Sequence, residues 1–563
     1  MKKIIIVLAG ACLFGSRMQA QNPNMGQISG NFQIDSRYLF PDTLINAPNV
    51  PEKGVLNGWG QLNYVNGKFS AGVRYEAFMN PTPDIDPRYK GQGFPYRFAS
   101  YKGEQLEIRL GNCYDQFGSG LIFRAYEDRG LVWDNSIDGF QARFTPRKGI
   151  YLKGIWGKQR AFWTQSAGIV RGFDGEININ EALDSLTKNW DARIILGGSF
   201  VSRYQIDQDP TYELPVNVGT WAARANIMWK RFSLYAEYGY KINDPQDGFK
   251  INNKYVYKPG QALYLSATYS QKGLGVILSA KHIDNFSFRS DRTATGTAMF
   301  INYLPALTKQ HTYILAAYYP YATQANGEVG AQAEVTYKIK KGTKLGGKYG
   351  TNVQFNYSVA HALDTVSLND TVRLMGYTTQ MGRWGDSLFF QDINIEINRK
   401  INQKLKLNLV YTFLRYNKNV IEGKANYPII NAHTAVVDVI WKINNKFTLR
   451  SDAEHMFVTT SDDNYFTHST HGNVVDFGHW VALTEELTIG EHWYVALMDQ
   501  YNYGNYESIR RIHYINGQVG YMRNTTRIIV GYGKQRAGIF CVGGVCRFVP
   551  ASNGFTLSIT SAF

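Results

Sequence analysis

A two-residue alternation of apolar and polar side chains recurs along the chain and constrains its fold more than any other feature. In 405–413 the apolar positions are Leu405, Leu407, Leu409, Tyr411 and Phe413. The residues between them include Lys406, Asn408 and Thr412. Successive side chains of a β-strand point to opposite faces, so this period predicts strands with one apolar and one polar face. The same pattern around 232–241, 392–398 and 447–454 predicts an all-β protein.

The last strand carries this alternation to the end of the chain. Its apolar face holds Phe555, Leu557, Ile559 and the terminal Phe563, with Ser561 as the exception. An amphipathic final strand that ends on an aromatic residue resembles the terminal signal of outer-membrane β-barrel proteins. Because residues 26–38 show a matching alternation, we expect the first and last strands to pair and to close a barrel.

The charged residues indicate which face of each strand is wet. Arg450, Asp452 and Glu454 share one parity. A basic residue facing lipid near the bilayer midplane costs about 2–4 kcal/mol, so the charged face is expected to line the interior. No apolar run after residue 20 approaches the roughly 18 residues that a membrane-spanning helix needs. The sequence therefore predicts a transmembrane antiparallel β-barrel.

Residues 1–20 are predicted to be a cleaved signal peptide. Lys2 and Lys3 precede an apolar run over 4–14, and the small Ala20 precedes Gln21. A lipoprotein signal ending at Cys12 is the less favoured alternative, because alanine occupies the position where leucine is usual. Residues 21–563 are expected to be exported through the inner membrane and to form the barrel in the outer membrane.

Short turns alternate with long polar loops along the chain. Short turns occur, for example, at 66–67, 230–231 and 444–445, and long loops at 80–95, 243–259 and 361–385. This alternation is typical of barrels with short periplasmic turns and long extracellular loops. Counting strands predicts an up-and-down barrel of about 24 strands, with a range of about 20 to 26, because 285–327 has room for one more hairpin. A soluble multidomain β protein is disfavoured, since no linker or fixed repeat interrupts the pattern.

The predicted mature chain is basic. The full sequence carries a formal charge of +15, and removing Lys2, Lys3 and Arg17 leaves 15 − 3 = +12. Such a barrel attracts anionic solutes through its lumen or binds phosphorylated lipid headgroups at its rim, and both interpretations stay open. Nucleic acid is not an expected partner, because the basic residues are scattered. The expected partners are outer-membrane lipid, the barrel-assembly machinery during insertion, and other outer-membrane proteins or lipoproteins.

Three cysteines follow residue 20. Cys541 and Cys546 flank Val-Gly-Gly-Val, and the two glycines allow so short a ring to close, which predicts a disulfide. A pair of thiolate metal ligands is the less favoured alternative, since no second pair occurs. Cys113 is expected to be a lone small residue in the wall, and no metal site or cofactor is predicted.

The stretch 114–138 combines several charges with large apolar groups. Its charged candidates for a pore lining or constriction are Arg124, Glu127, Asp128, Arg129 and Asp134. One interpretation is an inward-folded loop whose opposed charges set a transverse field. The other, which is favoured, is an ordinary strand pair with paired interior charges. No catalytic motif occurs, so the sequence predicts no enzyme.

Three stretches, 116–129, 318–324 and 531–550, resemble a family of large outer-membrane β-barrels of unknown function from Gram-negative bacteria. The strand patterning is more loosely similar to that of alginate-export-type porins. The resemblance implies a fold and a location and supplies no substrate. The first functional hypothesis is a porin-like channel or transporter for small solutes, with anionic solutes among the candidates. The alternative is a structural or accessory barrel subunit of a larger outer-membrane assembly, such as a secretion or protein-insertion machine.

Overall fold

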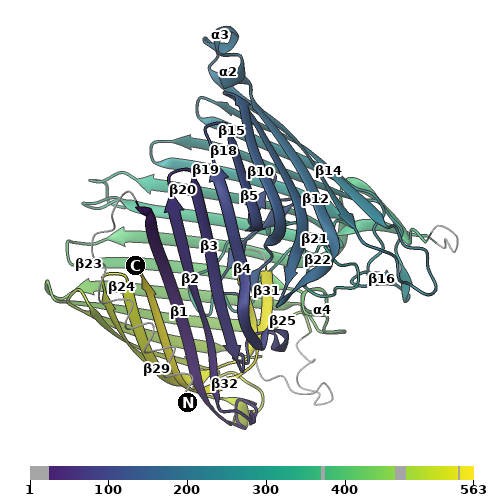
Figure 1. Ribbon diagram of the computed structural model, residues 1–563. Coiled ribbons are helices and arrows are strands. Elements are labelled where there is room, and N and C mark those ends of the chain that lie inside the picture. The colour runs from purple at the N-terminus through teal and green to yellow at the C-terminus, as the bar shows by residue number, and fades with distance from the viewer. Residues whose placement is uncertain (1–24, 369–373, 463–476, 543–544) are drawn as a thin grey trace.

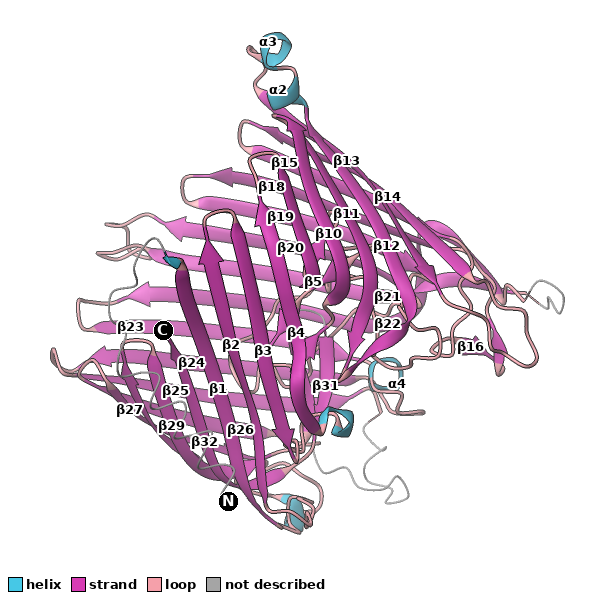
Figure 2. Ribbon diagram, in the orientation of Figure 1, coloured by secondary structure: helices cyan, strands magenta, loops and turns pink. Residues whose placement is uncertain are grey.

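The protein is one closed antiparallel β-barrel of 24 strands (Figure 1). The computed structural model describes residues 25–368, 374–462, 477–542 and 545–563, so the predicted signal peptide, residues 1–20, lies outside it. Each wall strand pairs with the next wall strand in chain order (Figure 2). The predicted fold class, strand number and up-and-down topology are therefore confirmed.

The wall strands keep the numbering of Figure 1. They are β1 (Gln27–Phe40), β2 (Gly54–Asn66), β3 (Phe69–Met79), β4 (Gly91–Lys102), β5 (Leu106–Cys113), β10 (Ile137–Arg147), β11 (Ile150–Ala161), β12 (Thr164–Asn178), β13 (Ala192–Tyr204), β14 (Asn217–Trp229), β15 (Phe232–Lys241), β18 (Gly260–Gln271), β19 (Leu274–Asp284), β20 (Gly327–Ile339), β21 (Thr351–Ser367), β22 (Tyr377–Lys400), β23 (Leu405–Tyr416), β24 (Ile430–Lys442), β25 (Phe447–Thr460), β26 (Trp480–Ile489), β27 (Trp493–Tyr501), β28 (Asn516–Arg523), β29 (Thr526–Gln535) and β32 (Ser552–Ala562). Short elements lie outside the wall: β16 (Lys250–Ile251), β17 (Lys254–Tyr255), β30 (Gly538–Val542), β31 (Val545–Val549), α2 (Ile179–Ala182), α3 (Asp184–Thr187), α4 (Lys418–Ile421), η2 (Pro87–Tyr89) and η3 (Ser508–Arg510).

The two ends of the chain close the barrel. β32 pairs antiparallel with β1, with Ile559 opposite Ile34 and Phe555 opposite Tyr38. Gly30 and Phe563 exchange both backbone hydrogen bonds, at 2.9 and 2.8 Å. The expected pairing of the first and last strands is confirmed, and the sheet is left without an edge at this point.

The outer face is apolar and carries two aromatic rows. At the end with the short turns the exposed rings include Phe69, Phe144, Trp229, Phe232, Trp441 and Trp493. At the end with the long loops they include Phe94, Phe140, Trp156 and Trp221. Aromatic girdles of this kind flank the lipid-facing band of outer-membrane barrels. Asp452 and Glu454 are buried on the inner face, as the shared parity of the charges predicts.

Two connections differ from the sequence-based expectation. The predicted loop 361–385 is partly strand, because β21 and β22 continue beyond the barrel to the pair Ser367 and Tyr377. Thr365, Val366 and Thr378 favour the extended conformation there. The segment 285–327 adds no hairpin to the wall, since β19 pairs directly with β20. None of the described helices is long and apolar enough to cross a membrane.

Candidate functional site in the lumen

The connections that fold into the barrel include two long ones. We call residues 114–136, between β5 and β10, the first inward segment, and residues 285–326, between β19 and β20, the second inward segment. The first contains β6 (Asp115–Gln116), β7 (Arg124–Ala125), β8 (Glu127–Asp128) and β9 (Trp133–Asp134). Backbone hydrogen bonds of 2.8 Å from Arg124 to Ile301 and of 2.9 Å from Tyr303 to Gly120 join the two segments.

Apolar burial holds the first inward segment against the wall. Phe117, Leu121 and Ile122 are fully buried, and they belong to one cluster with Ile155 and Val170 of the wall. Gly118 takes a φ of +54° at the turn, and a side chain there would meet the Glu237 carboxylate at 2.5 Å. The segment is therefore a packed plug element and differs from the ordinary strand pair that the sequence favoured.

The second inward segment is tied to strands on another part of the wall. Nζ of Lys309 lies 2.9 Å from Glu396, and Nε2 of His311 lies 2.8 Å from Asp392. Glu454 accepts hydrogen bonds from the backbone N–H groups of residues 314 and 315, at 2.9 and 2.8 Å. The segment thus reaches from β19 to β25. The sequence indicated only that 285–327 has room for one more hairpin, and no local pattern pointed to these anchors.

Three of the predicted charged residues belong to one buried network. The guanidinium of Arg74, on β3, is 1% exposed and contacts Glu76 at 2.7 Å, Glu127 at 2.8 Å and Asp134. Arg129 contacts the same Glu127 carboxylate at 2.8 Å. The charges of the first inward segment are thus largely neutralised by the wall and by one another.

A second wall arginine completes this network. Arg160, on β11, contacts Glu76 at 2.6 Å and Asp134 at 2.7 Å. Burial alone raises the pKa of the Asp134 carboxyl, but Arg160 and Arg74 outweigh it and hold that pKa below its ordinary value. Asp134 therefore stays ionised at neutral pH. In the sequence, Arg74, Glu76 and Arg160 stand out only because they occupy the alternate strand positions that face the interior. That pattern did not indicate that they contact one another.

The other two predicted residues make local contacts. The Arg124 guanidinium lies between the rings of Tyr126 and Tyr303, 4.1 and 4.2 Å from their centroids. The Asp128 carboxylate accepts a hydrogen bond of 3.1 Å from the backbone of Leu131. A role for these residues in a constriction stays a prediction.

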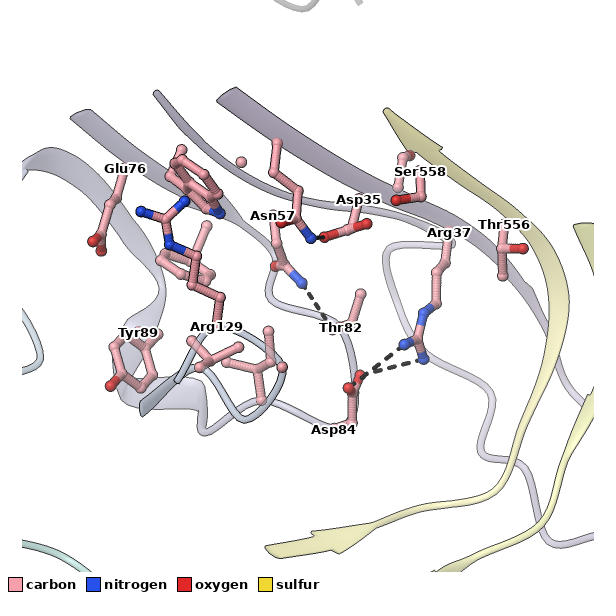
Figure 3. Close-up of a pocket in the computed structure, with 18 of the residues that line it drawn as sticks. Asp35, Arg37, Asn57, Glu76, Thr82, Asp84, Tyr89, Arg129, Thr556 and Ser558 are labelled. Carbon is pink, nitrogen blue, oxygen red and sulfur yellow. Dashed lines mark hydrogen bonds and ion pairs between the residues drawn. The ribbon is translucent and has the colours of Figure 1, made fainter. Parts of the chain in front are cut away.

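A cavity of about 390 Å³ lies between the first inward segment, the β3–β4 loop and the wall (Figure 3). In Figure 3 the side chains of Asp35, Arg37 and Asn57 project from β1 and β2 toward Thr82 and Asp84 of the loop. Arg37 pairs with Asp84 at 3.2 Å, and Asn57 donates a hydrogen bond of 2.8 Å to Thr82. The Oδ1 atom of Asn57 is buried and accepts no hydrogen bond from the described residues. Thr556 and Ser558 of β32 complete this side of the lining.

The lining of this cavity is polar and carries both signs of charge. It holds five arginines and six carboxylates. A volume of this size lies in the range of about 300–1,000 Å³ typical of small-molecule sites. Such a lining offers donors and acceptors to a small polar solute and does not select anions by net charge. In the described part of the chain, no group of three or more His, Cys, Asp or Glu side chains could hold a metal ion.

The β30–β31 hairpin contacts the same region. Arg547 of β31 donates hydrogen bonds of 3.0 and 3.2 Å to the carbonyls of Gly130 and Leu131 in the first inward segment. It also lies 3.2 Å from Asp84, so it links the loop, the segment and the hairpin.

Cys541 and Cys546 lie opposite each other in the β30–β31 register. Their side chains fall outside the described residues, so the disulfide stays a prediction. Directly opposed residues of antiparallel strands have Cα atoms about 4.5–5.5 Å apart, which suits a disulfide. Mass mapping of the unreduced protein should yield the two cysteines in one linked peptide. Alkylation of both without prior reduction would contradict it, and the buried, free Cys113 serves as the internal control.

Comparison with known proteins places the whole sequence in one family. A family model described as a family of unknown function (DUF6029) matches residues 1–563. Among curated proteins, no sequence matches.

Several solved structures share the barrel architecture at low identity. The translocation pore of the P pilus usher PapC is 9% identical, with a TM-score of 0.43 over 95% of this chain and 99% of that chain. A mutant ferric enterobactin receptor, PfeA, from Pseudomonas aeruginosa is 9% identical, with a TM-score of 0.43 over 95% and 80%. The outer membrane transporter YddB from Escherichia coli is 8% identical, with a TM-score of 0.38 over 95% and 81%. No residue role is taken from these likenesses.

Proposed function

Because the chain belongs to the DUF6029 family, whose description assigns no activity, we propose a function from the lumen itself: an outer-membrane transporter that binds a small polar solute in the 390 Å³ cavity. The outward apolar face with two aromatic rows supports the location. The expected solute carries both hydrogen-bond donors and acceptors, and net negative charge is not required.

One observation carries this proposal. The cavity is bounded by barrel wall on one side and by a packed inward segment on the other, so a solute in the lumen meets a shaped polar surface. The Oδ1 atom of Asn57, which has no hydrogen-bond partner among the described residues, supports the same conclusion, because a buried acceptor without a partner costs about 1–3 kcal/mol unless a ligand or water satisfies it.

Flux into liposomes that carry the purified protein tests this proposal. We expect uptake to saturate with concentration for a subset of small sugars, amino acids and organic anions. Replacing Asn57 with leucine should raise the half-saturating concentration, because it removes the acceptor and fills part of the cavity.

Asn226→Leu is the matched control, since Asn226 also faces the lumen but does not line this cavity. Unselective passage that never saturates would instead indicate a general pore. Liposomes that pass neither ions nor solutes would overturn the transport proposal.

The second candidate function is a structural or accessory barrel in an outer-membrane assembly. The observation that favours it is the second inward segment, which occupies lumen space from β19 to β25. It is held there by contacts of Lys309 and His311 with β22 and by hydrogen bonds to Glu454 of β25. Affinity purification from native membranes in mild detergent tests it: a stoichiometric partner would support this role, and isolation of the barrel alone would oppose it.

A further inference from the structure

The shortest strand pairing in the described wall lies between β4 and β5, and we call this boundary the seam. These strands pair over five residues only, Phe98–Lys102. β5 has eight residues, and the chain then turns into the lumen. A transmembrane strand needs about 9–11 residues. In the described pairings, residues 91–97 of β4 thus pair with β3 on one side and have no strand partner on the other side.

Side chains cover this unpaired edge in place of a strand. The Trp163 indole lies 2.9 Å from the position of a side chain at Gly91 and donates a hydrogen bond of 2.7 Å to the Tyr89 carbonyl. Pro95 has no N–H group, and the Arg97 N–H is capped by Asn112 at 2.9 Å. Among the described residues, β4 and β5 share no ladder of backbone hydrogen bonds above Phe98. Parting the wall there breaks the Arg97–Asn112 hydrogen bond and the ion pair of Arg97 with Asp138 of β10. Figure 2 shows the ribbons of β4 and β12 apart at this level, with the ribbon of β31 seen between them.

The seam lies at the level of the aromatic row near the long loops. On one side of the seam, Phe94 of β4 is 60% exposed. On the other side, Phe140 of β10 and Trp156 of β11 lie directly opposite each other in the strand pairing. This row marks the boundary between hydrocarbon and headgroups in the outer leaflet. Three cations, Arg97, Lys158 and Arg171, share the outward face around it, and among the ion pairs of the described residues they have one acidic partner, Asp138, 3.3 Å from Arg97. The outer side of the seam is thus suited to a phosphate-bearing headgroup.

A second cavity, of about 590 Å³, lies near the seam, since its lining includes Tyr89 and Phe162, which lie close in the chain to the seam edge at Gly91 and to Trp163. Half of its lining is apolar, including Ile85, Leu131, Phe162 and Phe548. It shares Asp84, Trp133, Asp134 and Arg547 with the first cavity, so the two spaces adjoin. The apolar half of this lining offers an acyl chain a surface to pack against. Charged residues of the other half are paired, Arg88 with Asp86 and Arg160 with Asp134.

We propose that the β4–β5 seam is a lateral opening to the outer leaflet. A phosphorylated lipid places its headgroup against Arg97, Lys158 and Arg171, and its acyl chain enters the second cavity past Trp163. This site does not depend on solute transport through the lumen.

Site-specific photo-cross-linking tests the proposal. Benzoylphenylalanine replaces Phe548, which lines the second cavity, in protein reconstituted with equimolar phosphatidylcholine and phosphatidylglycerol. We expect ultraviolet light to give a lipid adduct enriched in phosphatidylglycerol. The variant with Arg97→Ala, Lys158→Ala and Arg171→Ala should lose this enrichment, because the headgroup contacts are gone.

Two further positions make the outcome decisive. Phe94 faces lipid and serves as the positive control, and Tyr506, 55% exposed in the β27–β28 loop, serves as the negative control. Adducts at positions 94 and 548 but not at 506 would support the opening. Adducts at 94 alone would overturn it, and equal labelling with both lipids at 548 would overturn the headgroup assignment.

Discussion

Replacing Leu121 with aspartate is expected to release the first inward segment from the wall and to raise the conductance of the protein in planar bilayers. Leu121 is fully buried in the apolar cluster with Ile155 and Val170. An ionised carboxylate placed there loses its hydration without gaining a partner, at a cost of several kcal/mol. The cost falls on the segment, because the wall strands keep their own hydrogen-bond ladders.

Single-channel recording of the wild-type protein and of the variant measures this effect. Leu345→Asp is the matched control, since Leu345 is 71% exposed in the turn before β21 and should change neither conductance nor stability. Heat-modified mobility on gels reports whether the variant still forms a barrel. An intact Leu121→Asp barrel with wild-type conductance would show that the segment does not restrict the lumen.

Replacing Arg74 with alanine is expected to lower the free energy of unfolding by about 3–5 kcal/mol, as the loss of one partner of a buried ion pair does. Arg74 neutralises Glu76, Glu127 and Asp134, and its side chain is 1% exposed. Its removal leaves those carboxylates with Arg129 and Arg160 alone. The pairing joins β3 to the first inward segment, so the segment should also become accessible to protease.

Urea unfolding in lipid vesicles, followed by tryptophan fluorescence, measures the loss. Arg88→Ala is the control, because Arg88 is 63% exposed and pairs with the neighbouring Asp86, a contact worth about 0–1 kcal/mol. Adding Glu127→Gln and Asp134→Asn to Arg74→Ala should recover part of the stability, since fewer carboxylates then lack a partner. Equal losses in the Arg74 and Arg88 variants would contradict the network described here.

The residues that the first inward segment contributes to the candidate site could be predicted from the sequence. The charges of 114–138 cluster within one short stretch, so Glu127, Arg129 and Asp134 were recognised as a group. Their partners Arg74 and Arg160 lie in separate strands, and Arg74 is 53 residues from Glu127. Nothing in a local pattern links residues so far apart, because the contact forms only after the segment has turned into the lumen.

The sequence by itself determined the wall of this protein. Strand period, turn spacing and the amphipathic last strand are local properties, and hydrocarbon outside with polar lumen inside allows one register for each strand. The tertiary structure alone decided which segments fill the barrel and which two wall strands share the shortest pairing. In the sequence, Phe117, Leu121 and Ile122 are ordinary apolar residues. In the structure β5 ends at Cys113, the chain turns into the lumen, and these three side chains are buried against the apolar residues of the wall.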